Sequence, residues 1–298
     1  MVTSLPPVSI GIPFFNAERF LLDAIKSVFA QTHEDWELIL MDDGSTDSSL
    51  EIAQSIKDSR VRVYSDGDNK RLAARLNEIH AISRFEYVAR MDADDLMMPE
   101  RISRLLTLLQ DNPRYDLASC GAYSVDASLN LIGMRGEAVS DFTLDGLLQK
   151  SQRFLHAGLV ARRSWFQRNK YNESLFAAED AELWHRAAKG GDFKAVSIPD
   201  PLYVYREEGN VTKKKLSAAY RVERTHISKL IDRPPHRFSY LAKSWGKSAT
   251  VAALDAVGGL RYLLQRRQEG GLSLEALSEY KAGRDAVLRV SLPYVSDD

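Results

Sequence analysis

Hydrophobic residues recur along the first 110 positions in short runs that alternate with one-sided helical stripes. Runs at 8–12, 36–41, 61–64 and 87–91 have the length of buried strands. Each is followed by a segment with helical spacing; in the first, the apolar positions are Leu21, Ile25, Val28 and Phe29. Strand and helix in regular alternation are typical of a mostly parallel sheet with helices on both faces. The pattern therefore predicts an α/β fold.

Local signals complete the expected element order. Ser48 and Glu51 have the spacing of a capping box, and the acid Asp47 beside them is expected to support the same helix start. After residue 123 the regular alternation stops. The expected elements are then a hairpin over 124–134 with its turn at 127–130, a connection over 136–152, a strand at 157–161, a short helix at 164–169, a helix from 178 to Gly190-Gly191, extended pieces at 193–198 and 201–205, and helices from 216 that break at Pro234-Pro235 and Gly258-Gly259.

Polar residues collect where the predicted parallel strands end. The segments are Pro13-Phe14-Phe15-Asn16, Asp42-Asp43-Gly44-Ser45 and Asp92-Ala93-Asp94-Asp95. In an open α/β sheet these ends border the crevice in which ligands bind. Converging carboxylates suit Mg²⁺ or Mn²⁺, which takes its remaining ligands from substrate phosphates. We therefore expect a metal-held diphosphate; the competing interpretation is a set of solvated turns.

Composition narrows the classes of protein. The 298 residues suffice for one large domain or a domain with an appendage, and a net charge of -1 gives no indication of nucleic-acid binding. The single Cys120 lies in an apolar run, which predicts a core strand, no intrachain disulfide and a reducing, cytoplasmic compartment. No signal-peptide pattern precedes Val8, and no apolar run reaches roughly 18 residues, so neither standard secretion nor a membrane span is expected.

The charge is unevenly distributed along the chain. Residues 213–247 carry ten Lys or Arg against two acids, a local net charge of +8 that leaves -9 for the rest. Aromatic and aliphatic residues follow through Leu263, and this mixture predicts a helical segment over 213–264 at the surface of a membrane. The alternative is an ordinary helical pair packed on the rest of the chain or on a second copy in a homo-oligomer.

The motifs together resemble those of a known family. Neither G-x-G-x-x-G nor G-x-x-x-x-G-K-[ST] occurs, so a nucleotide would be held by a metal and side chains. Over about residues 8–206 the chain resembles family 2 glycosyltransferases of the GT-A fold. The resemblance rests on the three strand-end segments, the second extended to Thr46-Asp47, and on Arg71 with Asn77, Glu179-Asp180 with Leu183-Trp184 and Arg186, and Tyr205-Arg206. It implies inverting transfer from a nucleoside-diphosphate sugar, with UDP expected, to a glycan or lipid-linked acceptor in bacterial surface polysaccharide synthesis.

The resemblance implies five donor-side residues. Pro13 and Asp43 would lie beside the nucleobase, with Asp43 accepting its imide hydrogen. Asn16 would belong to the same nucleotide-sugar site, Arg71 would reach the nucleotide, and Asp92 would reach the ribose. Relatives often carry glycine just before the matching asparagine, whereas residues 70–75 contain none. This departure from the family pattern bears on the role of Arg71.

The resemblance also implies a metal ligand and a base. Asp94 would hold Mn²⁺ or Mg²⁺ against the diphosphate, and Asp180 would be the catalytic base; Glu179 is a further candidate. The chemistry needs both, because an attacking hydroxyl must lose its proton while a departing diphosphate must be neutralised. From the residues alone, Asp180 is favoured as a helix-start acid. His156 is favoured as a core histidine over an acceptor contact, and Arg206 as a solvated cation over a phosphate clamp.

Two other functions compete with a metal-dependent glycosyltransferase. A sugar-phosphate nucleotidyltransferase would want a glycine-rich loop after the first strand, which the chain lacks. A non-catalytic nucleotide-sugar-binding module would not need both Asp94 and Asp180. The expected domains are a catalytic domain at 1–212, with a donor half at 1–123 and an acceptor half at 124–212, and a helical C-terminal appendage at 213–298. The resemblance places the enzyme in the cytoplasm, with the inner face of the plasma membrane as the site of any lipid-linked acceptor.

Overall fold

Four parallel strands form the first half of a nine-stranded sheet. In this computed structural model, which describes residues 4–207, 212–256, 259 and 273–294, they are β1 (Val8–Phe14), β2 (Trp36–Asp42), β3 (Val61–Tyr64) and β4 (Tyr87–Arg90), in the order β3-β2-β1-β4. The connecting helices are α1 (Leu21–Phe29), α2 (Ser49–Ser55) and α3 (Arg71–Ile82). The predicted alternation of strand and helix is confirmed.

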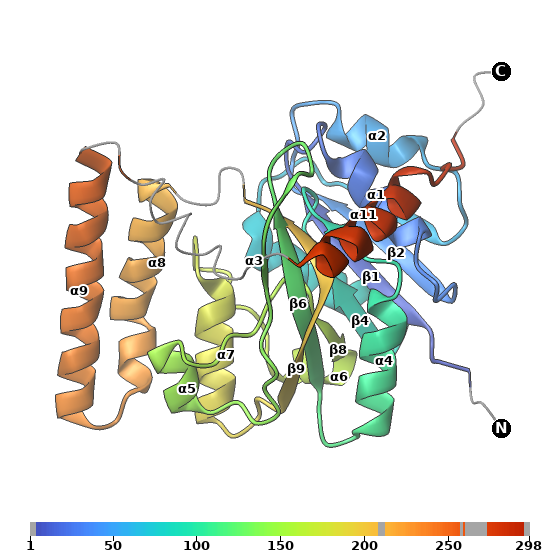
Figure 1. The fold of residues 1–298 in the computed structure, drawn as a ribbon. Coiled ribbons are helices and arrows are strands. Elements are labelled where there is room, and N and C mark those ends of the chain that lie inside the picture. The colour runs from blue at the N-terminus through green and yellow to red at the C-terminus, as the bar shows by residue number, and fades with distance from the viewer. Residues whose placement is uncertain (1–3, 208–211, 257–258, 260–272, 295–298) are drawn as a thin grey trace.

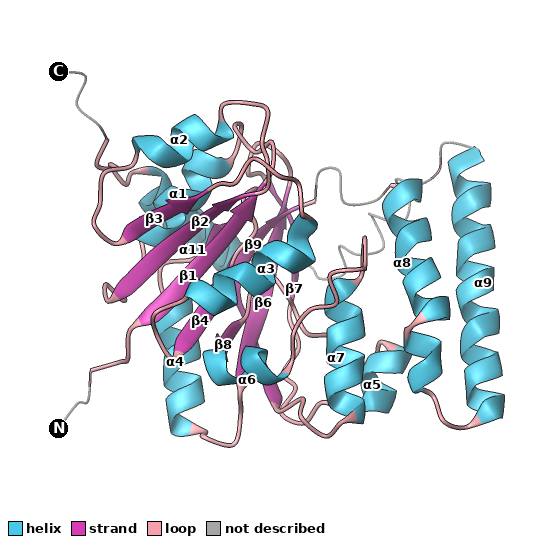
Figure 2. Cartoon of the chain, turned by 180° about the vertical axis from the view of Figure 1, so that it is seen from behind, coloured by secondary structure: helices cyan, strands magenta, loops and turns pink. Residues whose placement is uncertain are grey.

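Alternate residues of β2 build the two layers around the sheet. Leu38 and Leu40 belong to the main core, which α1, α2 and α4 (Arg101–Asp111) cover. Ile39 packs on the opposite face against Ile79 of α3. Side chains that alternate along a strand point to opposite faces, so a strand that is apolar throughout is buried on both. Figures 1 and 2 show the two faces with their helices.

The second half of the sheet mixes strand directions. Its strands are β5 (Leu96–Met97), β6 (Leu117–Val125), β7 (Leu131–Arg135), β8 (Val160–Arg162) and β9 (Ala195–Arg206), and its helices are α5 (Leu144–Gln149), α6 (Arg163–Arg168) and α7 (Glu179–Lys189). The order continues β4-β8-β6-β9-β5, and β6 pairs parallel with β9 but antiparallel with β7 and β8. The predicted 124–134 hairpin is confirmed as β6–β7. The sheet is therefore parallel from β3 to β4 and mixed beyond β4.

The predicted capping box is wrong. The Ser48 side chain makes no capping hydrogen bond at the start of α2. Instead the Asp47 carboxylate accepts hydrogen bonds from the Ser49 amide at 3.0 Å and from the Glu18 amide at 3.1 Å. An acid at this position also suits the positive end of the helix dipole. Asp47 is structural, as expected, and it additionally ties α2 to the loop before α1.

The C-terminal helices occupy two separate places. A pair formed by α8 (Lys213–Thr225) and α9 (Pro234–Ala256), with the 3₁₀ turn Ile227–Leu230 between them, stands at one end of the molecule (Figure 1). The last described helix, α11 (Leu274–Leu288), contacts α1 and buries Tyr280, whose hydroxyl donates to the Leu129 carbonyl at 2.7 Å. Residues after 273 thus return to the body of the protein. The predicted boundaries at 212 and 213 stay a prediction.

None of the described helices combines the length and the apolar composition that crossing a membrane requires.

Candidate active site

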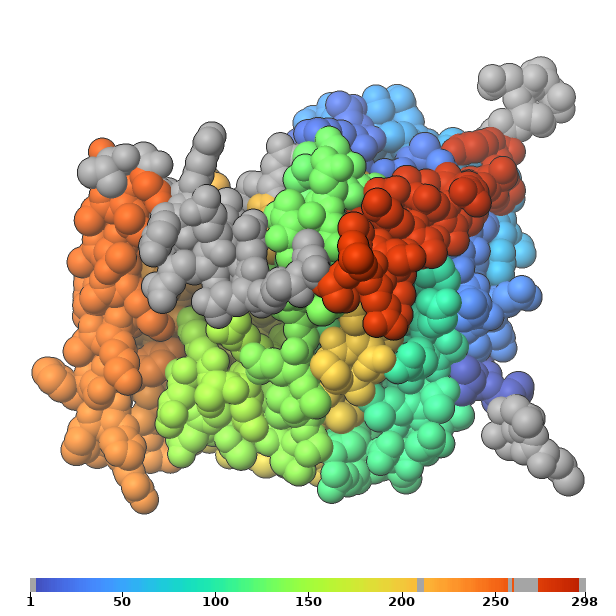
Figure 3. Space-filling model, viewed as in Figure 1, coloured from blue at the N-terminus to red at the C-terminus, as the bar shows by residue number. Residues whose placement is uncertain are grey.

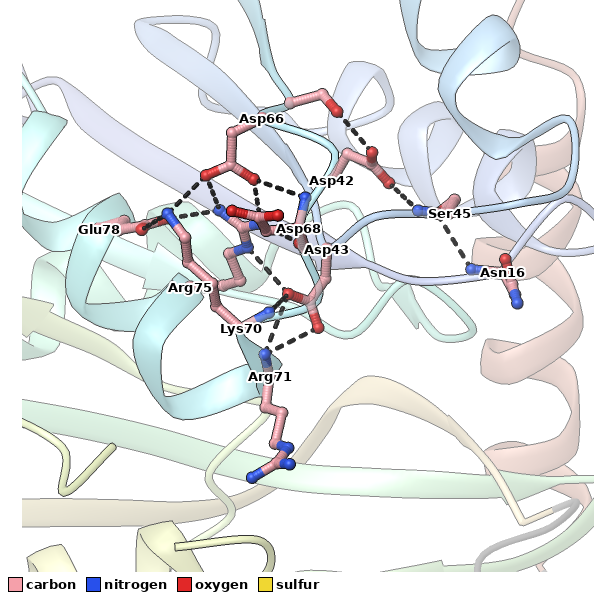
Figure 4. Close-up of polar contacts among 11 residues, drawn as sticks. Asn16, Asp42, Asp43, Ser45, Asp66, Asp68, Lys70, Arg71, Arg75 and Glu78 are labelled. Atoms are coloured by element: carbon pink, nitrogen blue, oxygen red, sulfur yellow. Dashed lines mark hydrogen bonds and ion pairs between the residues drawn. The ribbon is translucent and has the colours of Figure 1, made fainter. Parts of the chain in front are cut away.

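The tips of β1 and β2 are joined by a loop clamp centred on Asn16 (Figure 4). The Asn16 amide donates to the Ser45 hydroxyl at 3.1 Å, and its side-chain oxygen accepts from the Thr46 amide at 2.8 Å. Asn16 adopts a φ of +48°, a left-handed conformation that asparagine tolerates better than most residues. Pro13 lies buried in β1 opposite Met41. Asn16 therefore ties together the loops that follow β1 and β2.

Asp43 is held at the tip of β2 by three donors from the start of α3. Its carboxylate accepts from the Lys70 amide at 2.8 Å, the Arg71 amide at 3.0 Å and the Arg75 Nε at 2.9 Å. Arg75 is only 1% exposed and also pairs with Asp66 at 2.7 Å (Figure 4). The Asp43 side chain is thereby fixed in one orientation. Sequence analysis missed Arg75, whose signal was a cation on the buried face of an otherwise apolar helix stripe.

Arg71 occupies a backbone conformation that favours glycine. Its φ is +74°, whereas Lys70 before it is in the right-handed region. Successive residues of these two kinds turn their amides toward one point and form an anion-binding nest, here filled by the Asp43 carboxylate. The guanidinium points away from that cluster (Figure 4) and stacks 3.7 Å from the centroid of the exposed Phe176 ring. Arg71 therefore adopts a glycine-like conformation in the stretch where relatives often carry glycine.

The carboxylates that follow β4 have different surroundings. Asp95 is buried and accepts from the Tyr203 hydroxyl and the Arg206 amide, each at 2.8 Å, so it is a structural acid. Asp92 is partly exposed and accepts a short hydrogen bond from Arg90. Asp94 is also partly exposed; burial, followed by the nearby charge of Asp92, raises the pKa of its carboxyl. Asp92 and Asp94 are therefore the two partly exposed acids of this segment.

These two carboxylates fit a divalent cation. Burial, and then the charge of Asp92, raises the pKa of Asp94, and a bound cation would relieve the repulsion between the two carboxylates. Oxygen donors are the ligands that Mg²⁺ and Mn²⁺ favour, and one or two carboxylates leave coordination positions for phosphate. The two carboxylates are therefore chemically suited to the expected metal site at Asp94.

Arg206 has a structural setting. It is 3% exposed, donates to the Asp94 carbonyl at 2.7 Å and contacts Asp23 at 3.3 Å. The guanidinium also lies 4.5 Å from the centroid of the Phe20 ring. The interpretation of Arg206 as a solvated cation is wrong, because the residue is buried as a brace between α1 and the acid cluster.

A second group of acids begins α7. Asp180 lies with its Oδ2 3.8 Å from the Nδ1 of His156, and His156 Nε2 is 2.7 Å from the Tyr171 hydroxyl. Burial, followed by the charge of Asp180, raises the pKa of Glu179 to about 7. Burial also raises the pKa of Asp180, while Arg90 acts in the opposite direction. Glu179 and Asp180 thus form a coupled, partly desolvated pair.

Arg90 brings the two groups of acids together. This buried residue of β4 donates to Asp92 and is also an electrostatic neighbour of Glu179 and Asp180. Burial opposes its charge, but Asp92, followed by Tyr171, Tyr203 and Glu179, together outweigh that cost and raise the pKa of the guanidinium. The fold therefore unites acids that are about ninety positions apart in the sequence. Sequence analysis missed Arg90, although a cation inside an apolar strand is an informative signal.

One His/Glu/Asp cluster in the described part of the chain has metal-binding spacing. The donor atoms of His156, Glu179 and Asp180 lie within 4.8 Å of one another. Arg90 already supplies a buried positive charge beside them, and His156 is engaged with Tyr171. A metal ion at this cluster would be repelled by the neighbouring Arg90 guanidinium. The Asp92/Asp94 pair therefore fits a metal better.

Comparisons with known proteins identify the class of this chain. The profile of Glycosyl transferase family 2 matches residues 9–173. EpsE of Bacillus subtilis (strain 168), which is named as a glycosyltransferase, is 30% identical over 264 residues, covering 85% of this chain and 93% of EpsE. The chain therefore belongs to glycosyl transferase family 2, and it is a glycosyltransferase.

Two solved structures share the fold. S. aureus TarS 1-349 in complex with UDP-GlcNAc has a TM-score of 0.62 at 16% identity, covering 93% of this chain and 79% of that chain. Mannosyltransferase PcManGT from Pyrobaculum calidifontis in complex with GDP-Man and Mn²⁺ has a TM-score of 0.55 at 15% identity, covering 95% of this chain and 85% of that chain. With the family match, the predicted GT-A fold is confirmed.

Proposed function

We propose that the chain is an inverting, metal-dependent glycosyltransferase that moves a sugar from a UDP-sugar to a glycan or lipid-linked acceptor. The observation that carries the proposal is the position of Arg90, which contacts the donor-side Asp92 and neighbours the acceptor-side pair Glu179-Asp180. A transferase needs both kinds of acid around one anomeric carbon, since one side neutralises the diphosphate and the other takes a proton. A simple binding module has no use for the second group.

The donor half of the site is formed by the tips of β1, β2 and β4. Asp43, fixed by Arg75 and the Lys70–Arg71 amides, accepts the imide hydrogen of the base beside Pro13. Asp92 accepts from the ribose, and Asp94 holds the metal. When bound, Mn²⁺ or Mg²⁺ supplies positive charge to the departing diphosphate. Arg71 serves the nucleotide through its amide at Asp43 and its guanidinium at the rim.

The acceptor half supplies the base. Asp180 takes the proton of the acceptor hydroxyl, the oxygen of that hydroxyl forms the new bond to the anomeric carbon, and the bond to the diphosphate oxygen breaks with its electron pair. The proton then resides on the Asp180 carboxyl. A single displacement from the face opposite the leaving group inverts the anomeric configuration. The raised pKa of Asp180 suits this task, because a more basic carboxylate accepts a proton more readily.

The donor proposal is tested with a panel of nucleotide sugars. The purified protein is incubated with UDP-Glc, UDP-GlcNAc and GDP-Man in the presence of Mn²⁺, with and without an extract of cellular glycans, and released nucleoside diphosphate is measured. We expect release from a UDP-sugar that rises when acceptor is added. Pyrophosphate formation from UTP and a sugar phosphate would instead indicate a nucleotidyltransferase. Donor binding without any release would indicate a binding module.

The same proposal includes contact with a membrane that carries a lipid-linked acceptor. On α9, Phe238 and Trp245 are 75% and 63% exposed, and the exposed positions that share their face are Ala242, Ala249, Ala252 and Ala256. The opposite face, with Val251, packs on α8. Figure 3 shows α9 along one edge of the molecule. An apolar face with basic residues nearby is typical of an interfacial helix at the inner surface of a plasma membrane.

Part of the predicted membrane segment is revised by this geometry. Val251 lies in the segment expected at the membrane surface, but it is buried in the structure. The last apolar residues of the same expected segment, Val257, Leu260, Tyr262 and Leu263, lie outside the described residues. The aromatic contribution among the described residues therefore comes from Phe238 and Trp245, with Arg224 stacked 4.1 Å from the centroid of the Trp245 ring.

We expect the protein to co-sediment with anionic vesicles at low salt and to be released at high salt. Each nearby Lys or Arg contributes about 1 kcal/mol at an anionic surface, and salt screens that attraction. The double variant Phe238→Ala/Trp245→Ala should bind more weakly, whereas Leu274→Ala, which changes an exposed residue on α11, is the matched control. Equal binding to neutral vesicles, or none at low salt, would contradict membrane contact. If the wild type forms dimers and the double variant does not, the face is an oligomer interface instead.

A further inference from the structure

His156 lies between Asp180 and Tyr171 and faces each with a different ring nitrogen. Its Nδ1 is 3.8 Å from Asp180 Oδ2, and its Nε2 is 2.7 Å from the Tyr171 hydroxyl. The ring is buried, and burial, followed by the positive charge of Arg90, lowers its pKa. His156 is therefore a neutral imidazole with one protonated nitrogen. Which nitrogen carries the proton determines what the ring presents to Asp180.

Tyr171 determines the tautomer. Burial raises the pKa of its phenol, so the hydroxyl keeps its proton and can donate to His156 Nε2. The proton of the imidazole then resides on Nδ1, facing the carboxylate. With the opposite tautomer, the lone pair of Nδ1 would face the negative charge of Asp180, which is repulsive. The favourable arrangement is Tyr171 O–H to Nε2 and Nδ1–H toward Asp180.

Tyr171 is itself held by α3. The Asn77 side chain donates to the Tyr171 carbonyl at 3.0 Å and accepts from the Tyr171 amide at 3.0 Å. The Tyr171 ring lies nearly parallel to Phe166, with centroids 5.9 Å apart. These contacts fix the phenol relative to the helix whose first residues bind Asp43. Asn77, whose role sequence analysis left open, thus supports the hydroxyl that orients His156.

We propose that His156 and Tyr171 are positioning residues for Asp180: the Nδ1–H of His156 orients the carboxylate toward the acceptor hydroxyl. The inference rests on the proposed function, in which Asp180 is the base. The other charged or titratable groups around Asp180 are Glu179, Arg90 and His185, and His185 is hydrogen-bonded to the Ala181 carbonyl. The Ala181 amide donates to Oδ1 of Asp180 at 2.7 Å, and His156, in the loop before β8, faces Oδ2.

Two isosteric substitutions separate this role from a packing role. In His156→Asn the side-chain amide can occupy the place of Nδ1, so the donor to Asp180 is kept and the partner of Tyr171 is lost. In His156→Gln the amide can occupy the place of Nε2, so the partner of Tyr171 is kept and the donor to Asp180 is lost. We expect kcat to fall about 10- to 100-fold in His156→Gln and clearly less in His156→Asn, with donor KM unchanged in both. Tyr171→Phe should also lower kcat, because without the phenol hydroxyl the imidazole proton is no longer held on Nδ1.

The reverse order of the two variants would overturn the inference, because it is the result expected if His156 only braces Tyr171. Equal activity of both variants and the wild type would overturn it as well. A rise in the Mn²⁺ concentration needed for half-maximal activity in both variants would make His156 a metal ligand instead. Thermal unfolding of each variant confirms that the comparison is made between folded proteins.

A double-mutant cycle separates failure of the inference from failure of the proposed function. If His156 acts through Asp180, His156→Gln should lower the residual rate of Asp180→Asn by much less than it lowers the wild-type rate. An unchanged multiplicative loss in the Asp180→Asn background would overturn the inference and leave the base assignment standing. Wild-type kcat in Asp180→Asn alone would remove the base assignment and the inference with it.

Discussion

Asp180→Asn is expected to lower kcat by about 10²- to 10⁴-fold while nucleotide affinity hardly changes. The amide keeps the shape of the side chain and its place at the start of α7, but it cannot take a proton from the acceptor hydroxyl. Asp180 lies on α7 in the group around His156, whereas the proposed contacts to the nucleotide come from the tips of β1, β2 and β4. Steady-state rates with saturating donor, together with UDP binding by calorimetry, measure the two quantities separately.

Glu179→Gln is the matched control for this prediction. It removes the neighbouring carboxylate of the coupled pair and leaves Asp180 in place. We expect a smaller loss of kcat than in Asp180→Asn. A larger loss would make Glu179 the base. If Asp180→Asn lost UDP binding as strongly as it lost kcat, Asp180 would belong to the donor site.

The pH dependence of kcat offers a second readout for the same pair. A general base must be ionised, so kcat should fall as the pH drops below the pKa of Asp180. Burial raises the pKa of Asp180 above that of an ordinary aspartate, so the acid limb should lie at higher pH than for an exposed carboxyl. Because Glu179 and Asp180 are coupled, the limb reports the pair rather than one residue.

The N-terminal half of the fold could be predicted because its elements follow local rules. Continuous apolar runs define β1, β2 and β4, and short connections to one-sided helices force a parallel order. Once the sheet is parallel, the carboxyl ends of the strands fall on one edge, so Asn16, Asp43 and Asp92 could be grouped without coordinates. The approximate place of β9 was also predictable, but as two pieces, because Pro199 and Pro201 interrupt the pattern.

What could not be predicted depends on contacts between distant segments. The capping box at Ser48 and Glu51 satisfied a local rule, yet Asp47 forms the cap because it can also reach the Glu18 amide. Similarly, no local pattern indicates that Tyr280 returns to contact Leu129. Arg90 could have been noticed as a charge in a strand, but its proximity to Asp180 depends on where α7 packs.

Asp94→Ala is expected to lower kcat/KM by at least about 100-fold, because it removes a ligand of the cation that neutralises the departing diphosphate. The same substitution should not destabilise the protein at neutral pH. A carboxyl whose pKa is raised in the folded state costs stability when ionised, so removing Asp94 relieves its repulsion with Asp92. Activity and melting temperature should therefore separate: activity falls, while Tm stays level or rises.

Asp95→Asn provides the contrasting control. Asp95 accepts from the Tyr203 hydroxyl and the Arg206 amide in a buried position, so substitution there should lower Tm. Chelation of the wild type with EDTA should abolish turnover, and added Mn²⁺ or Mg²⁺ should restore it in the wild type but not in Asp94→Ala. Turnover near the wild-type level in Asp94→Ala, combined with indifference of the wild type to EDTA, would contradict the metal site, and the diphosphate would then have to be neutralised by cationic side chains alone.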